Sequence, residues 1–179
     1  AVVAETFAAH GIPYQDKLAI TGVKGILHGK TPGPTISILG ELDSLICPES
    51  PFADRTTGAA HTCGHNAQIA TCLGAGIALK RSGVLEQLAG RVACIAVPAE
   101  EFVEIGYRLN LKREGAIEFL GGKAELVRLG HFDDVHMAML VHAAGGTPAA
   151  SLKYGSTSNG FLAKMVRFKG TAAHAGMAP

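Results

Sequence analysis

The chain has 179 residues, 47% of them hydrophobic and 17% charged, a composition typical of globular rather than disordered proteins. The formal net charge of +1 and the lack of a Lys/Arg run exclude a basic surface for nucleic acid. No apolar run is long enough to span a membrane, and the N-terminus does not have the layout of a signal peptide. Four cysteines without a CxxC pair suit a reducing compartment. We therefore expect a cytoplasmic protein that binds neither nucleic acid nor membrane.

The first part of the chain predicts a helix, a hairpin and a buried strand. Residues 1–11 resemble the last turns of a helix that Gly11 closes. The segment Leu18–His28 combines β-favouring residues with two glycines, which is typical of a hairpin or of two short strands. The short apolar segment Thr35–Leu39 predicts a buried strand, which leads into a loop that carries Asp43.

The rest of the chain predicts alternating helices and strands. A helix is indicated from Ile69 to Gly83 by apolar residues at helical spacing. The continuous apolar run Val92–Val97, ended by a proline, is typical of a central parallel strand. A polar stretch follows, then a helix over Lys123–Leu129 and a buried strand over Val135–Val141. This alternation predicts an α/β fold with a mostly parallel sheet flanked by helices.

Metal-binding side chains stand at the ends of these predicted elements. Cys63 and His65 precede a helix, while Glu100, Glu101 and His142 follow strands. Thiolate, imidazole and carboxylate together form the ligand set of borderline-soft divalent metals such as zinc. In open α/β sheets the functional site lies outside the carboxyl ends of the strands, so we expect these side chains to converge. A carboxylate next to a ligand carboxylate also suits a general base in metal-dependent hydrolysis.

These residues resemble, in order, the motifs of the M20 metallopeptidase superfamily. The matching segments are Glu41-Leu-Asp43, His61-Thr-Cys-Gly-His65-Asn66, Pro98-Ala-Glu-Glu101, the strand end at His142 and Gly170-Thr-Ala-Ala-His174. The similarity runs from about Gly33 to Pro179 and is greatest to the amidohydrolase arm, which includes hippurate and aminobenzoyl-glutamate hydrolases and M20 dipeptidases.

The resemblance implies a function and a role for each matching residue. Cys63, His65, Glu101 and His142 would bind two divalent metal ions, zinc or manganese, with Asp43 supporting them. Glu100 would be the general base, and His174 would polarise the scissile carbonyl, often across a homodimer. The substrate would be a small amide, either an N-acyl or N-aminoacyl amino acid or a dipeptide.

The resemblance also implies a division into domains. Residues 1–158 would form the N-terminal part of the catalytic domain. Residues 159–179 would begin an α+β lid and dimerisation domain with an alternating strand over Phe161–Phe168. Both ends of the chain read as cut, so we expect a fragment of a longer protein.

Four departures from the family pattern leave other interpretations open. Asn66 and Glu41 stand where aspartates are usual, the segment between Glu101 and His142 is longer, and no residue matches a further histidine that follows the lid. One alternative is therefore a non-catalytic fragment that folds but does not complete the metal site. Another is a cysteine hydrolase in which Cys63 is the nucleophile and His61 or His65 its base.

Overall fold

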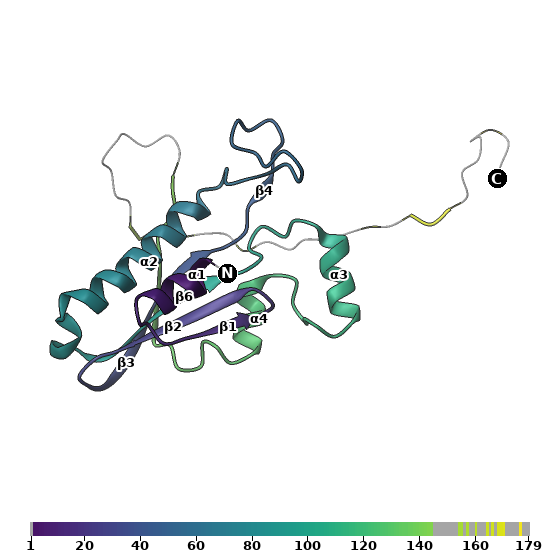
Figure 1. Ribbon diagram of the computed structural model, residues 1–179. Coiled ribbons are helices and arrows are strands. Elements are labelled where there is room, and N and C mark those ends of the chain that lie inside the picture. The colour runs from purple at the N-terminus through teal and green to yellow at the C-terminus, as the bar shows by residue number, and fades with distance from the viewer. Residues whose placement is uncertain are drawn as a thin grey trace. The chain divides into compact units, whose positions relative to one another are not determined.

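The computed structural model describes residues 2–144 and, beyond them, residues 154, 155, 157, 160, 164, 166, 168–170 and 176. Its five N-terminal strands lie between two helices in the sequence, and two further strands and helices follow (Figure 1). In order they are α1 (Val2–Ala9), β1 (Tyr14–Leu18), β2 (Gly22–His28), β3 (Thr31–Glu41), β4 (Leu45–Ile46), β5 (Ala59–Ala60), α2 (His65–Ser82), the 3-10 helix η1 (Val84–Gln87), β6 (Ala89–Val97), α3 (Ile105–Arg113), α4 (Gly122–Arg128) and β7 (Met137–Leu140).

The central sheet of the described residues has the strand order β1-β2-β6-β3-β7. Strands β6, β3 and β7 run parallel, whereas β1 pairs with β2 and β2 with β6 in antiparallel fashion. The predicted α/β class with a helix-flanked sheet is therefore confirmed, and its pairings divide equally between parallel and antiparallel. The predicted hairpin is also present and begins four residues earlier than expected, at Tyr14.

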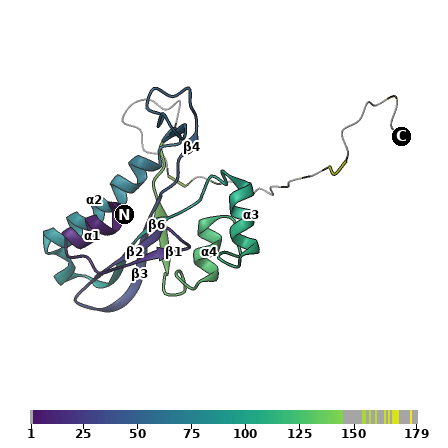
Figure 2. The same ribbon diagram turned by 45° about the vertical axis from the view of Figure 1, so that its right-hand side comes forward.

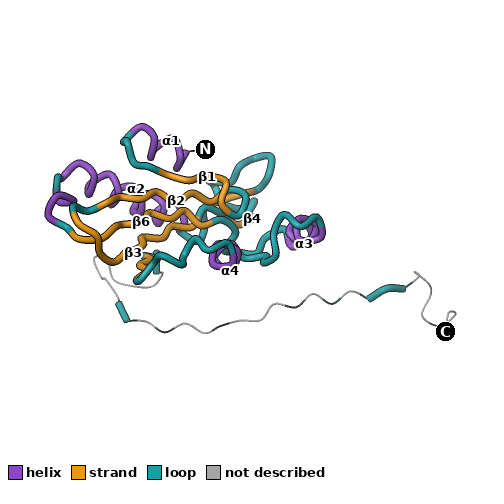
Figure 3. Tube along the Cα trace, turned by 90° about the horizontal axis from the view of Figure 1, so that it is seen from below, coloured by secondary structure: helices purple, strands orange, loops and turns teal. Residues whose placement is uncertain are grey.

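The sheet separates two apolar layers, because successive side chains of a strand point to opposite faces. On one face, Cys94 and Ala96 of β6 pack with Phe7 of α1 and Cys72 of α2. On the other face, the alternate β6 residues and Leu39 pack against Leu126 of α4. Figure 2 shows α1 and α2 on one side of the sheet and α4 on the other, and Figure 3 shows the same layers from below.

Several local predictions are confirmed by these elements. Gly11 and Gly83 follow α1 and α2 with φ of 62° and 73°, the left-handed conformation typical of a residue that ends a helix. Strand β6 is central, since it pairs on both sides. The helix predicted over Lys123–Leu129 is α4, which lies one residue earlier at each end.

Two features differ from the prediction. The polar stretch after Glu101 contains a helix, α3, none of whose residues is buried. The segment predicted as a buried strand forms β7, but all four of its residues are exposed, with Met137 58% and Met139 57% accessible. The reason is position: within the described chain β7 pairs only with β3 and lies at the edge of the sheet. An apolar sequence indicates that a strand tends to be buried, but burial also needs another element that packs over the strand.

The described chain separates into Ala1–Gly145, a compact unit that contains the whole sheet, and Gly146–Pro179. The boundary predicted between residues 158 and 159 and the strand predicted over Phe161–Phe168 involve residues outside the described ranges, so both stay predictions. No helix among the described residues is long and apolar enough to cross a membrane.

Candidate metal centre

The three parallel strands deliver the predicted site residues to one edge of the sheet. Strand β3 ends two residues before Asp43, β6 ends shortly before Glu100 and Glu101, and β7 ends two residues before His142. Because β6, β3 and β7 are neighbours and run the same way, their carboxyl ends lie side by side. Helix α2 starts at this edge with His65, so the expected convergence is present.

Gly64 turns the chain between Cys63 and His65. It adopts φ of 102°, which is open to glycine and strained for other residues, and an added Cβ would lie 3.0 Å from the Ala143 side chain. This turn starts α2 with the His65 imidazole buried at 1% exposure. The Nδ1 of His65 lies 2.9 Å from the backbone carbonyl of Asp43. Since a carbonyl can only accept, Nδ1 carries a proton, and in the neutral imidazole Nε2 then has a bare lone pair.

That lone pair faces carboxylate oxygens. The Nε2 of His65 is 2.9 Å from Glu41 Oε2, 3.7 Å from Glu101 Oε1 and 4.0 Å from Glu100 Oε2. Both His65 Nε2 and Glu101 Oε1 are buried, and neither has a hydrogen-bond partner among the residues that the structure describes. A lone pair directed at anionic oxygens is unfavourable unless a cation or a proton lies between them. The arrangement therefore fits a bound metal ion.

Cys63 and His142 lie beside His65 and add a sulfur and a nitrogen donor to this candidate centre. The Cys63 thiol is 3.3 Å from Nε2 of His142, whose Nδ1 lies 2.6 Å from the Ala143 carbonyl. The rings of His65 and His142 are perpendicular, with centroids 5.9 Å apart. One donor atom from each of Cys63, His65 and His142 lies within 4.8 Å of the others. Three nitrogen and sulfur donors at this spacing match the ligands that zinc prefers.

The protein groups around Cys63 favour its protonated thiol over the thiolate. Burial, followed by the hydrogen bond to Glu101 and the negative charge of Glu101 and Glu100, raises the pKa of Cys63 to about 11. A divalent cation among these groups would reverse the balance, because a coordinating thiol loses its proton.

Asp43 supports the ligands through hydrogen bonds rather than facing the centre itself. Its Oδ2 accepts a hydrogen bond of 2.8 Å from the backbone N–H of Glu101, and its Oδ1 lies 3.4 Å from Nδ1 of His65. Contacts of this kind fix the orientation of metal-binding side chains. The supporting role that the sequence predicts for Asp43 stays a prediction, and these contacts are compatible with it.

The loop that carries Glu100 and Glu101 is strained. Ala99, Phe102 and Glu104 adopt positive φ of 61°, 53° and 54°, a conformation that costs non-glycine residues of order 1–3 kcal/mol each. The two glutamates between these positions diverge: the Glu100 side chain is 35% exposed and that of Glu101 is 19% exposed. Burial, and then the nearby Glu41 carboxylate, raises the pKa of Glu100 above its usual range.

Two residues of the centre are missed by sequence reasoning. The sequence marks Glu41 only as a departure from the family pattern, yet its carboxylate is the nearest one to the His65 ring. Lys123 forms an ion pair with Glu41 and lies 3.8 Å from Glu100. No sequence signal could have found Lys123, because 82 residues separate it from Glu41. His174, the remaining predicted site residue, lies outside the described residues.

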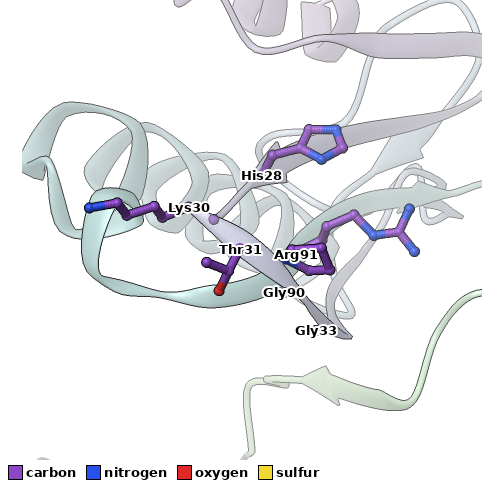
Figure 4. Close-up of a pocket in the computed structure, with 8 residues that line it drawn as sticks. His28, Lys30, Thr31, Gly33, Gly90 and Arg91 are labelled. Atoms are coloured by element: carbon purple, nitrogen blue, oxygen red, sulfur yellow. The ribbon is translucent and has the colours of Figure 1, made fainter.

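A hollow at the opposite end of the sheet is separate from this centre. It has a volume of about 440 Å³ and is lined by His28, Gly29, Lys30, Thr31, Pro32, Gly33, Gly90 and Arg91. These residues lie at the carboxyl end of β2, in the turn after it and at the amino ends of β3 and β6, and β3 extends roughly 3.3 Å per residue toward the candidate metal centre. Figure 4 shows that Lys30 projects away from His28 and Arg91, so its basic groups do not converge on one point.

Comparisons with known proteins support the resemblance seen in the sequence. A subunit of the p-aminobenzoyl-glutamate hydrolase of Escherichia coli is 32% identical over 170 residues, which cover 89% of this chain and 35% of the relative. The indole-3-acetyl-aspartic acid hydrolase of Enterobacter agglomerans is 31% identical over 170 residues, with the same coverage. The crystal structure of a dinuclear metal-binding M20 peptidase of Bacillus subtilis matches with a TM-score of 0.58. Over the residues that these matches cover, the chain is similar to the M20 metallopeptidases.

These matches cover most of this chain but only about a third of each relative. The match to the Bacillus subtilis structure is 24% identical and covers 76% of this chain and 34% of that structure's chain, so it supports the fold. No model of a known protein family matches the chain. The chain spans about a third of the length of the curated relatives it matches.

Proposed function

We propose that this chain forms the metal-binding part of an M20 hydrolase that cleaves amide bonds in N-acyl or N-aminoacyl amino acids or dipeptides. One observation carries the proposal. The bare Nε2 of His65 and the unpartnered Oε1 of Glu101 are buried 3.7 Å apart, beside a thiol and a second imidazole. The relatives named for hydrolysing aminobenzoyl-glutamate and indole-acetyl-aspartate support an acyl amino acid as the substrate class.

In this proposal the ligands are those predicted from the sequence. Cys63, His65, Glu101 and His142 hold two divalent ions, zinc or manganese. When bound, such ions polarise a carbonyl oxygen and lower the pKa of water toward neutrality. The number of ions is supported by the similarity to the Bacillus subtilis peptidase, which is dinuclear.

Glu100 acts as the general base in this scheme. Its carboxylate is near the centre, 4.0 Å from His65 Nε2, yet it is the more exposed of the two adjacent glutamates. It can therefore face an attacking water, take its proton and return that proton to the leaving amine nitrogen. A raised pKa improves the match between this group and its task near neutral pH.

Further parts of the proposal concern the rest of the protein. His174 would stabilise the oxyanion from the lid that begins at residue 159, and the lid would pair two copies into a homodimer. Residues 1–158 would belong to the catalytic domain. We also place the protein in the cytoplasm, which its four free cysteines support.

The cysteine-nucleophile alternative is disfavoured by the surroundings of Cys63. A nucleophilic cysteine needs a thiolate, and nearby positive charge normally lowers its pKa. Here burial and the carboxylates of Glu101 and Glu100 raise the pKa of Cys63 to about 11. The same carboxylates attract a divalent cation. They therefore oppose Cys63 as a nucleophile and favour Cys63 as a metal ligand.

Metal analysis of two cysteine variants tests the proposal. Cys63→Ser is expected to lose most of the bound zinc or cobalt measured by elemental analysis after dialysis, because a neutral hydroxyl replaces a thiolate ligand poorly. Cys47→Ser is the matched control: it removes a thiol from a loop, where the Cys47 Sγ lies 4.0 Å from Glu49 Oε2. Equal metal content in the two variants would reject Cys63 as a ligand, and a wild-type chain that binds no metal would favour the non-catalytic fragment.

A further inference from the structure

The metal centre contains two overlapping groups of donor atoms. One group is Cys63, His65 and His142, and the other is Glu41, His65 and Glu100. His65 belongs to both, and its single free lone pair on Nε2 can bind one ion at a time. The first group offers sulfur and nitrogen, whereas the second offers mainly carboxylate oxygen. An ion at His65 must therefore join one group or the other.

Lys123 lies against the second group. Its ammonium forms an ion pair with Oε1 of Glu41 and lies 3.8 Å from Oε1 of Glu100. The Glu41 side chain is only 3% exposed, so this ion pair places a positive charge at a buried carboxylate. The other Glu41 oxygen, Oε2, is the one that lies 2.9 Å from His65. Lys123 thus pairs with both carboxylates of the second group, Glu41 and Glu100, which we call the oxygen-rich group.

Packing holds the backbone of Lys123 beside these acids, while its side chain is 43% exposed. The preceding residue, Gly122, donates its N–H to the carbonyl of Ala99 at 3.1 Å, on the loop that carries Glu100. An added Cβ at Gly122 would lie 1.7 Å from the Pro98 carbonyl oxygen, so the start of α4 is seated closely on that loop. Three residues after Lys123, Leu126 is fully buried against the sheet. The backbone that carries Lys123 is therefore packed against this loop, which brings the ammonium within reach of Glu41 and Glu100.

We propose that Lys123 determines which donor group takes the metal, occupying Glu41 and Glu100 and directing ions to Cys63, His65 and His142. The inference rests on the proposed metal-binding function. A fixed ammonium and a divalent cation repel each other strongly at the same carboxylate oxygens. Lys123 is a positioning residue in this account: it keeps Glu41 and Glu100 out of the coordination sphere, which leaves Glu100 available as a base.

Cobalt binding to the whole chain tests the role of Lys123. Total bound cobalt is measured by equilibrium dialysis, and the near-ultraviolet thiolate-to-cobalt absorbance shows how much is bound to Cys63. Lys123→Met should bind cobalt roughly tenfold more tightly at the oxygen-rich group, because a repelling charge is removed. Its thiolate absorbance per bound ion should fall, since the oxygen-rich group now competes for His65. Lys123→Arg keeps the charge and should resemble the wild type.

Lys112→Met is a closely matched control. Lys112 and Lys123 have side chains that are each 43% exposed, and each forms an ion pair with a glutamate, but the partner of Lys112 is Glu118. Lys112→Met should leave cobalt affinity and absorbance per ion unchanged. If Lys123→Met gives the same binding curve as Lys112→Met, the proposal is overturned.

A double variant tests the proposal even if Lys123→Met unfolds the chain. Such unfolding would occur because Glu41 is left buried without its charged partner. Glu41→Gln combined with Lys123→Met removes both charges and should return the cobalt curve to that of the wild type. A curve that stays tightened in the double variant would show that Glu41 is not the ligand set free, and would reject the proposal. A wild-type chain without thiolate absorbance would instead count against the proposed metal site itself.

Discussion

Replacing Gly122 with alanine would disturb the packing of α4 against the loop that carries Glu100. The added Cβ would lie 1.7 Å from the Pro98 carbonyl oxygen and 2.7 Å from its carbonyl carbon, well inside van der Waals contact. Both atoms are backbone, so a side-chain rotation cannot relieve the clash. Helix α4 must move away from the loop, which breaks the hydrogen bond from Gly122 N–H to the Ala99 carbonyl.

The expected loss of stability follows from two unfavourable terms and one favourable term. Forcing extra volume into a well-packed site costs about 1–3 kcal/mol, and the lost hydrogen bond adds about 1 kcal/mol. The better helix propensity of alanine returns less than about 1 kcal/mol. We therefore expect the free energy of unfolding to fall by about 2–3 kcal/mol, a large part of the 5–15 kcal/mol that is typical of a domain.

Urea denaturation followed by circular dichroism measures this change. With a slope of about 2 kcal/mol per molar urea, the midpoint should fall by about 1 M. Gly74→Ala is the control, because an added Cβ at Gly74 within α2 meets no atom within 4 Å. Alanine there should raise stability by up to about 1 kcal/mol through helix propensity. Equal midpoints for Gly122→Ala and the wild type would refute the close packing of α4 on the Glu100 loop.

Two further predictions concern single carboxylates. Glu100→Gln should keep the metal content of the wild type while amide hydrolysis falls by about two to four orders of magnitude, and near-normal turnover in a metal-replete variant would remove Glu100 from the role of base. The second concerns Glu125, whose pKa is lowered from 4.5 to about 2 by hydrogen bonds to Arg128 and to backbone N–H groups. Its stabilising effect is present above pH 4.5 and is lost as the pH falls toward 2. Urea midpoints of the wild type and Glu125→Gln should therefore converge over that range, and a gap independent of pH would contradict the lowered pKa.

The convergence of the candidate metal-binding side chains could be predicted from the sequence because it depends on the ends of strands. Glu101 and His142 follow apolar runs, and parallel strands bring their carboxyl ends to one edge whatever the details of packing. Cys63 and His65 precede a helix whose periodicity is clear in the sequence. The structure brings these four residues and Asp43 together as predicted.

The partner of each strand was not fixed by its own sequence. A continuous apolar run such as that of β6 indicates burial on both faces, but it does not say that one neighbour is antiparallel. The apolar residues of β7 likewise predicted a buried strand, whereas the described chain leaves Met137 and Met139 exposed. Burial depends on which other elements pack against a strand, and this is a property of the whole fold.

The sequence by itself determined the chemistry of the site: a thiol, two imidazoles and adjacent carboxylates at the carboxyl ends of strands. Only the tertiary structure decided which positively charged side chains lie beside these carboxylates. Lys123 reaches Glu41 across 82 residues because Gly122 lets α4 sit closely on the loop after β6. No local pattern encodes such a contact, since periodicity and spacing describe single elements, and the electrostatics of a site depend on every charge that packing brings within a few ångströms.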